Sequence, residues 1–169
     1  MPFVGIISKE NDSNFIKNAI CKNSKFNKFE VLNINKKSIE NIKNIKFDIL
    51  VISENIETLL KNSKYLEEIL NKTDFIIVNS DIKNNLSLMK FIGANIITYG
   101  FNAKATVTIS SIKDENTMLC VQRTINGAKE IIDVQEFSIQ IEKNNVNKLY
   151  NVLVIFTILA IYGEILQKI

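Results

Sequence analysis

The sequence predicts an α/β domain built on a doubly wound, mostly parallel β-sheet. Apolar, β-branched runs alternate with helix-length amphipathic segments over residues 1–102, which is the pattern of parallel strands connected by helices. Three further strands follow over residues 103–142 with short, turn-rich connections, which indicates an antiparallel meander at one side of the sheet. Strongly apolar residues within 144–169 predict a C-terminal buried helix. We expect the whole chain, residues 1–169, to form one domain.

The parallel part is expected to contain five strands, connected by right-handed helical crossovers. Most of these strands read as continuous apolar runs, which indicates burial on both faces of the sheet. The expected strands span residues 3–8, 29–34, 48–53, 75–78 and 96–99.

Four helices are expected between these strands. Each begins after polar residues or carries apolar residues at helical spacing. They span residues 15–22, capped by Asn11, Asp12 or Ser13; 37–45; 56–70, with Ser63 as a candidate interruption; and a short helix through Leu86, Met89, Lys90 and Ile92, closed by Gly93.

The second part of the chain is expected to add strands at residues 105–112, 117–124 and 134–141, followed by a helix at 149–166. The apolar core of that helix is shorter than the roughly 20 residues that a membrane span requires. Asn151, Gly163 and Glu164 would also lie within a span of that length. A packed core helix is therefore favoured over a membrane helix.

The composition argues against several classes of protein and of binding site. The net charge is only +3, and the lysines are scattered among acidic residues, so the chain lacks the basic stripe of a nucleic-acid-binding protein. Two cysteines and no histidine are too few for a structural zinc site, and Cys21 and Cys120 are expected to be reduced and buried. The first residues, MPFVGIIS, lack the features of a secretion signal, so a cytoplasmic protein is expected.

Small polar residues follow two of the predicted parallel strands. Asn79 and Asp81 come after one strand, and Tyr99 and Gly100 end the next. Ligands of open α/β sheets bind beyond the carboxyl ends of strands, so these are the first candidate site residues. Asn79 and Asp81 would bind a ribose or a metal, or would only end the strand and cap the following helix. Tyr99 and Gly100 would stack a base, or would only form a turn.

Three segments together resemble the central domain of the Mur ligases, the ATP-dependent amide ligases that build the peptidoglycan stem peptide. These segments are VNSD at 78–81, NIITYGFN at 95–102 and LYNVLVIFTILAIYG at 149–163, in the order that the family shows. The resemblance implies a vestigial nucleotide site formed by Asn79, Asp81, Tyr99, Gly100 and Asn151. In this site Asn151 would contact the adenine edge; the alternative is that it satisfies a neighbouring backbone group.

The chain departs from the family where ATP would be cleaved. A phosphate loop needs glycines, a lysine and a hydroxyl, whereas residues 8–14 contain no glycine and place Glu10 and Asp12 where they would repel a triphosphate. The magnesium-binding glutamate of the family falls on Ser53, with Glu54 one position later. We therefore expect no catalytic residue, no metal ligand and no cofactor. Any binding of ATP or ADP would be a remnant of the family's nucleotide site.

These observations predict a non-catalytic, stand-alone Mur-ligase-like protein, because the flanking substrate and ligase domains of the family have no counterpart here. The resemblance implies a scaffold or regulator linked to cell-wall synthesis. One alternative is a nucleotide- or metabolite-binding module without hydrolysis. Another is an interaction protein that docks on a membrane or partner through its C-terminal helix. An unidentified protein or a second copy of the chain is the expected partner, since the outer meander strand would expose unpaired backbone groups.

Overall fold

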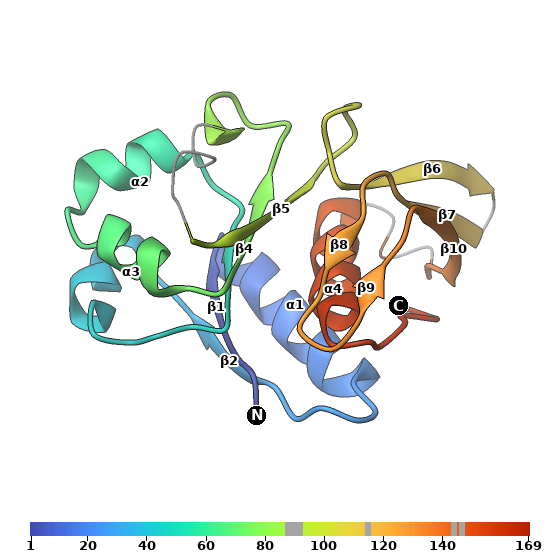
Figure 1. Ribbon diagram of the computed structural model, residues 1–169, viewed down its shortest axis with the longest axis horizontal. Helices are drawn as coiled ribbons and strands as arrows, with labels where there is room; N and C mark the ends of the chain where they lie inside the picture. Colours follow the sequence, from blue (N-terminus) through green and yellow to red (C-terminus); the bar gives the residue numbers. More distant parts are fainter. Residues whose placement is uncertain (87–92, 114–115, 143–144, 146–147) are drawn as a thin grey trace.

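A computed structural model describes residues 1–86, 93–113, 116–142, 145 and 148–169 (Figure 1). Within these residues the main sheet has eight strands in the order β10-β7-β6-β5-β4-β3-β1-β2, and a separate ribbon pairs β8 with β9. The strands are β1 (Phe3–Ile7), β2 (Glu30–Asn33), β3 (Ile49–Ile52), β4 (Phe75–Asn79), β5 (Asn95–Tyr99), β6 (Val107–Lys113), β7 (Asn116–Val121), β8 (Ile125–Asn126), β9 (Ile131–Ile132) and β10 (Gln135–Gln140).

Strands β1 to β5 are parallel, and β6, β7 and β10 form an antiparallel meander beside β5. The chain passes from β1 to β2 on one side and then returns to build β3, β4 and β5 on the other side. The direction of winding therefore reverses between β1 and β3, which is the topological switch point of a doubly wound sheet. The expected fold class, a mostly parallel α/β sheet with a meander at one side, is confirmed at this level.

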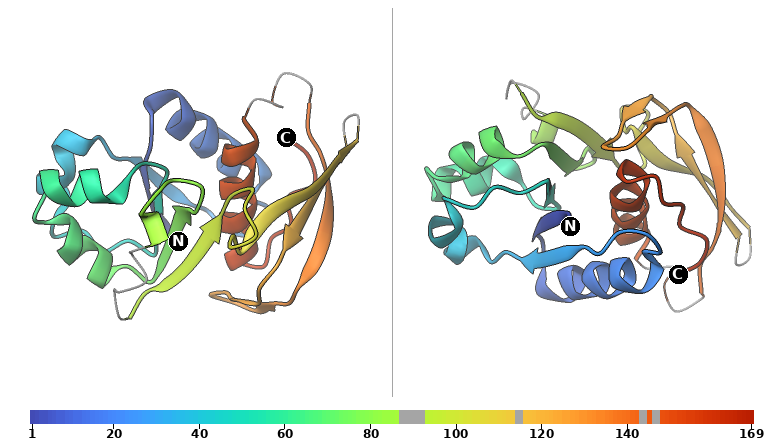
Figure 2. Two further views of the ribbon diagram at one scale, coloured as in Figure 1. Left: turned by 90° about the horizontal axis from the view of Figure 1, so that it is seen from above. Right: turned by 60° about the horizontal axis from the view of Figure 1, so that its bottom comes forward.

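Helices cover both faces of the parallel strands (Figures 1 and 2). Successive strand residues point to opposite faces, so one set of side chains packs with α1 (Glu10–Asn23) and α4 (Leu149–Ile161). The other set packs with η1 (Lys36–Ile42), α2 (Ile56–Asn62) and α3 (Leu66–Lys72). This two-sided cover explains why most of the parallel strands read as continuous apolar runs.

Helix α4 lies inside the protein, between α1 and the meander (Figure 2). Every residue from Asn151 to Ile161 is buried, and the Phe156 ring lies 5.0 Å from the Phe137 ring of β10. Asn151 is a buried polar residue at its start. The expectation of a packed core helix is confirmed, and no helix within the described residues is long and apolar enough to cross a membrane.

The end of α4 differs from the expectation. The helix stops at Ile161 instead of Leu166, because Gly163 takes a left-handed conformation (φ +73°) and the Glu164 N–H donates to Leu159 O over 3.0 Å. The chain then turns back along the meander. There Gln140 N donates to Gln167 O and Ile169 N donates to Gln140 O. The outer strand β10, expected to be an exposed edge, is therefore paired at one end by the C-terminal residues.

Other boundaries also differ. Helix α1 begins at Glu10 and not at residue 15, so the three expected capping residues lie inside the helix. Segment 37–45 is a 3-10 helix from Lys36 to Ile42, and segment 56–70 is divided at Ser63 into α2 and α3, as the interruption suggested. Most of the short helix expected before Gly93 falls on residues 87–92, outside the described residues.

Two further expectations are wrong in detail. The strand expected over residues 117–124 ends at Val121, and the chain then forms the β8–β9 ribbon, which the sequence did not indicate. Cys21 is exposed and Cys120 is half-buried, although both are free thiols. Cys21 lies on the exposed face of α1, and Cys120 lies on the outward face of β7, the middle strand of the meander, so neither side chain is drawn into the core.

The burial of α4 generates a stability prediction. Phe156→Ala should lower the free energy of unfolding by about 3–5 kcal/mol, because the ring is fully buried and its removal leaves a cavity. Urea denaturation would measure this change. Ile165→Ala is the control, since this side chain is 59% exposed just after the helix, and the change should stay within about 0.5 kcal/mol. Equal effects of the two substitutions would contradict the placement of α4 in the core.

Candidate functional site

The five expected site residues lie together at the carboxyl edge of the parallel sheet. Asn79 ends β4, Tyr99 ends β5, and Asp81 and Gly100 lie in the loops that follow these strands. Asn151 is in the first turn of α4. Neighbouring strands and the start of one helix thus bring together residues that are far apart in the sequence.

The Asp81 carboxylate binds the β5–β6 loop. Its Oδ2 accepts from Phe101 N over 2.7 Å and from the Tyr150 hydroxyl over 3.0 Å, and its Oδ1 accepts from Asn102 N over 3.2 Å. Asn79 Oδ1 accepts from Asp81 N over 2.9 Å. Burial raises the pKa of Asp81, but the hydrogen bonds from Phe101, Asn102 and Tyr150 outweigh it and leave that pKa below its usual value. Asp81 therefore connects β4, the β5–β6 loop and α4.

Gly100 is required by this arrangement. A Cβ atom at this position would lie 2.8 Å from Asp81 Oδ2 and 2.8 Å from Ser80 Oγ. The absence of a side chain lets the Asp81 carboxylate reach the backbone of the next strand's loop. The glycine therefore belongs to the same contact as Asp81.

The Tyr99 ring is buried, and its hydroxyl forms a 2.8 Å hydrogen bond with Ser53 Oγ at the end of β3. Burial raises the pKa of this phenol well above its usual value. The exposed aromatic surface at this edge comes instead from Tyr150 and Phe101, whose ring centroids are 4.6 Å apart. Sequence reasoning missed both residues. The signal that could have found Tyr150 was its position as an aromatic residue in the first turn of α4.

Asn151 connects two helices. Its Nδ2 donates to Asp12 Oδ1 over 2.8 Å, so the first turn of α4 is bound to the first turn of α1. The sequence left open an adenine edge or a backbone group as its partner; within the chain the partner is a side-chain carboxylate. Asp12 Oδ1 therefore already accepts a hydrogen bond from within the chain.

A cavity of about 420 Å³ opens beside this network, at the switch point between β1 and β3. Its wall combines the ends of β1, β2 and β3 with the starts of α1 and η1. The lining residues are Ser8, Lys9, Glu10, Ser13, Asn33, Ile34, Asn35, Lys36 and Glu54. Open α/β sheets bind ligands in this position, so the cavity is a better candidate site than the Asp81 network.

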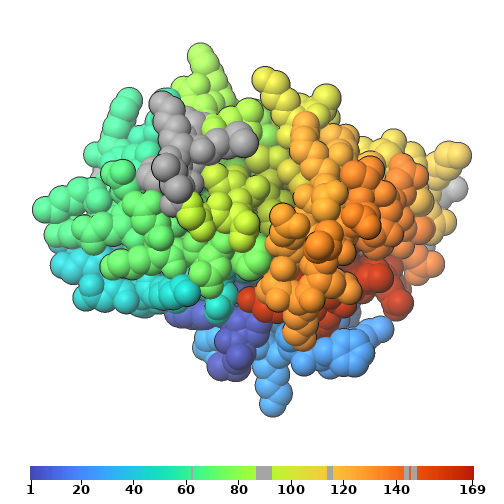
Figure 3. Space-filling view, in the orientation of Figure 1, coloured from blue at the N-terminus to red at the C-terminus, as the bar shows by residue number. Residues whose placement is uncertain are grey.

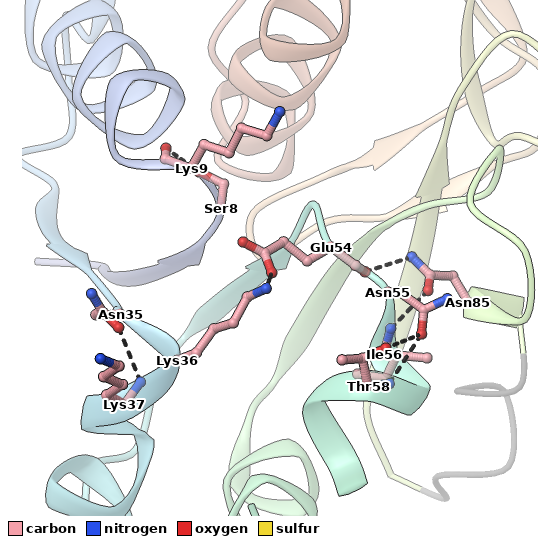
Figure 4. A network of polar contacts seen from close by, with 10 residues as sticks. All are labelled: Ser8, Lys9, Asn35, Lys36, Lys37, Glu54, Asn55, Ile56, Thr58 and Asn85. Carbon is pink, nitrogen blue, oxygen red and sulfur yellow. Dashed lines mark hydrogen bonds and ion pairs between the residues drawn. The ribbon is translucent and has the colours of Figure 1, made fainter. Parts of the chain in front are cut away.

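An ion pair spans this cavity. Lys36, at the start of η1, reaches Glu54, which follows β3 (Figure 4). The four charged residues of the wall, Lys9, Lys36, Glu10 and Glu54, have charges that sum to zero. A ligand here therefore meets both signs of charge at short range.

Asn33 lies in the wall, but its side-chain oxygen is buried behind the wall. Its Nδ2 donates to Asn14 Oδ1 over 2.7 Å, whereas its buried Oδ1 has no hydrogen-bond partner within the described residues. A buried acceptor without a partner is costly. Because this oxygen has almost no solvent-accessible surface, a ligand in the cavity would contact other atoms of the wall. Sequence reasoning missed Asn33 and Lys36, because only the winding of the sheet places β2 beside β1 at the switch point.

The position of Glu54 is set by a buried asparagine. Asn85 Nδ2 donates to Glu54 O over 3.0 Å, and Asn85 Oδ1 accepts from Ile56 N over 3.0 Å (Figure 4). Asn85 Nδ2 also donates to Asn79 O over 3.1 Å. Asn85 is fully buried. It therefore connects the loop after β3 to the loop after β4, and the cavity to the Asp81 network.

The connection between β1 and α1 does not suit a triphosphate. Only Ser8 and Lys9 separate strand from helix, which leaves no loop to wrap phosphate oxygens. The Ser13 hydroxyl is bound to Ser8 Oγ over 2.7 Å and donates to Lys9 O over 3.1 Å. Glu10 and Asp12 already place negative charge at the start of the helix.

The described residues contain no group of three or more aspartate, glutamate or cysteine side chains close enough to hold a metal ion. No protein-family model matches the chain, and no curated protein matches its sequence. The geometry of the carboxyl edge is therefore the basis from which a function is inferred.

The Asp81 contacts generate a pH prediction. A folded-state pKa below the unfolded one means that Asp81 stabilises the fold above the unfolded pKa, and that this stability is lost as pH falls through the folded pKa. Because the carboxylate is partly exposed and screened by solvent, Asp81→Asn should cost only about 1 kcal/mol at neutral pH.

The difference in unfolding free energy between Asp81→Asn and the unchanged protein should narrow below about pH 4. Urea denaturation at a series of pH values would show this. Asp133→Asn is the control, since Asp133 is an exposed aspartate outside the site. An Asp81→Asn difference that does not vary with pH would contradict the assignment.

Proposed function

We propose that this chain is a non-catalytic module, similar to a Mur ligase central domain, that binds a small polar molecule in the cavity between β1 and β3. The observation that carries the proposal is the cavity itself: about 420 Å³ at the switch point, with two lysines and two glutamates in its wall. The resemblance adds a role as scaffold or regulator linked to cell-wall synthesis.

The wall selects the class of ligand. Its charges balance, so a neutral or zwitterionic molecule loses its hydration at lower cost there than a polyanion would. The ligand would contact Lys36 or Glu54 with polar groups. A nucleoside triphosphate would bring several negative charges against Glu10 and Glu54.

The same edge of the sheet favours a role without catalysis. ATP cleavage needs donors around the phosphates and a metal to neutralise developing charge. Here the strand-to-helix connection is two residues long, and the oxygens of Asp81 accept from groups of the chain itself. The fold thus supports binding by hydrogen bonds and charge without a step of bond cleavage.

The first test is for ATP chemistry. Purified protein with ATP and magnesium should release no phosphate above a buffer blank, and calorimetric titration with ATP should show no saturable heat. ADP and a UDP-sugar, each with and without magnesium, extend the same titration. Magnesium-dependent turnover by clean protein would overturn the non-catalytic assignment.

The second test is for the cavity. Thermal unfolding would be followed with a panel of neutral and zwitterionic metabolites, and at about 100 times its dissociation constant a true ligand should stabilise the protein by about 2.7 kcal/mol. For a chain of this size that corresponds to about 5–10 °C in Tm. If no compound shifts the Tm, the cavity is not a binding site.

The double variant Lys36→Ala, Glu54→Gln should abolish the ligand-dependent shift. Its own stability should change by less than about 1 kcal/mol, because the pair is partly exposed. Lys46→Ala is the matched control, because it removes an exposed ion pair in which Lys46 Nζ lies 3.0 Å from Asp74 Oδ1. These two residues precede β3 and β4, so the pair lies at the opposite edge of the sheet. This control should keep the full ligand-dependent shift.

A further inference from the structure

The loop between α1 and β2 presents a bare aromatic side chain to solvent. Phe26 is 83% exposed, the largest exposed fraction among the large hydrophobic residues that the structure describes. The loop lies on the side of the molecule where β1 begins, opposite the carboxyl edge, and Glu30 N after it donates to Pro2 O (Figure 1). The segments that project at the lower edge of Figure 3 include this part of the chain, in light blue.

The loop is held by a buried carboxylate from the other end of the chain. Glu164, only 5% exposed, accepts from Ser24 Oγ over 3.0 Å, from Lys25 N over 2.6 Å and from Asn27 N over 3.0 Å. Lys129 Nζ donates to Asn27 Oδ1 over 2.8 Å. Phe26 lies between two of these anchored residues, so its projection into solvent is built into the fold.

Several lysines lie near Phe26 in the sequence, and one more reaches its loop from another part of the fold. Lys25 and Lys28 flank Phe26, Lys22 is in the last turn of α1, and Lys129 reaches the loop from the β8–β9 turn. The Glu164 oxygens face the donors of the loop, which leaves the outward charge of the loop basic.

We propose that the Phe26 loop, residues 24–28, docks on a bilayer surface that contains anionic phospholipids. Such a surface combines negative headgroups with an apolar layer directly beneath them. Lysines are attracted to anionic lipids close to the surface, and their long stems keep the ammonium groups among the headgroups. The Phe26 ring enters the boundary between headgroups and acyl chains.

The preformed loop favours this interaction, because little conformational freedom is lost on docking. Since the loop lies at the amino edge, docking leaves the cavity between β1 and β3 facing away from the membrane. This is contact with the membrane surface, and it requires no membrane-spanning helix.

Co-sedimentation with vesicles tests the proposal. The protein should bind phosphatidylcholine vesicles that contain phosphatidylserine, bind vesicles of phosphatidylcholine alone far more weakly, and lose binding as salt is raised. Phe26→Ser, and separately Lys25→Glu with Lys28→Glu, should each weaken binding by at least about tenfold. Glu164→Gln should also weaken binding, although it removes no lysine and no apolar side chain.

Matched controls keep the test specific. Val134→Ser changes a side chain that is 62% exposed on another part of the surface. Lys37→Glu with Lys104→Glu reverses two exposed lysines near the carboxyl edge. Both controls should bind vesicles like the unchanged protein. Equal binding to both kinds of vesicle, no binding to either, or equal losses in the control variants would overturn the proposal.

Discussion

The burial of α4 is the constraint on which the rest of the structure depends. A helix that is apolar on every side is stable only if other elements cover all of it. Helix α1 and the parallel strands cover part of α4, and the meander with its C-terminal pairing covers the remainder. The first turn of α4 then carries Tyr150 to Asp81 and Asn151 to Asp12, so the same packing arranges the carboxyl edge.

The carboxyl edge is divided into two regions with different chemistry. Around Asp81, polar groups satisfy one another and connect β4, the β5–β6 loop and α4. At the switch point, the cavity wall carries two lysines and two glutamates whose charges balance. Groups that already have partners, like those around Asp81, gain little from a ligand. This contrast favours the cavity over the Asp81 network as the binding site.

Two carboxylates perform the same task at opposite edges of the sheet. Asp81 accepts backbone N–H groups of the β5–β6 loop, and Glu164 accepts those of the α1–β2 loop. Hydrogen bonds lower the pKa of each carboxyl group although burial opposes this, so each remains ionised and attached to its loop at neutral pH. The β5–β6 loop belongs to the Asp81 network at the carboxyl edge, and the α1–β2 loop carries Phe26 at the amino edge. The two edges of the sheet therefore present different surfaces.

Local pattern was enough to predict the eight strands of the main sheet, the two-sided cover of its parallel part and the core position of α4, because apolar periodicity reports burial directly. It also placed Asn79, Asp81, Tyr99 and Gly100 at one edge, since parallel strands end together, whereas Asn151 joined them only through the family resemblance. Only the tertiary structure decided what these residues contact and where the cavity lies. Asp81 meets Tyr150 across 69 positions and Glu164 meets Lys25 across 139, and such pairs leave no local signal. The pairing of β2 with β1 is likewise set by the winding of the chain, so Lys36 and Asn33 became site residues only in the folded sheet.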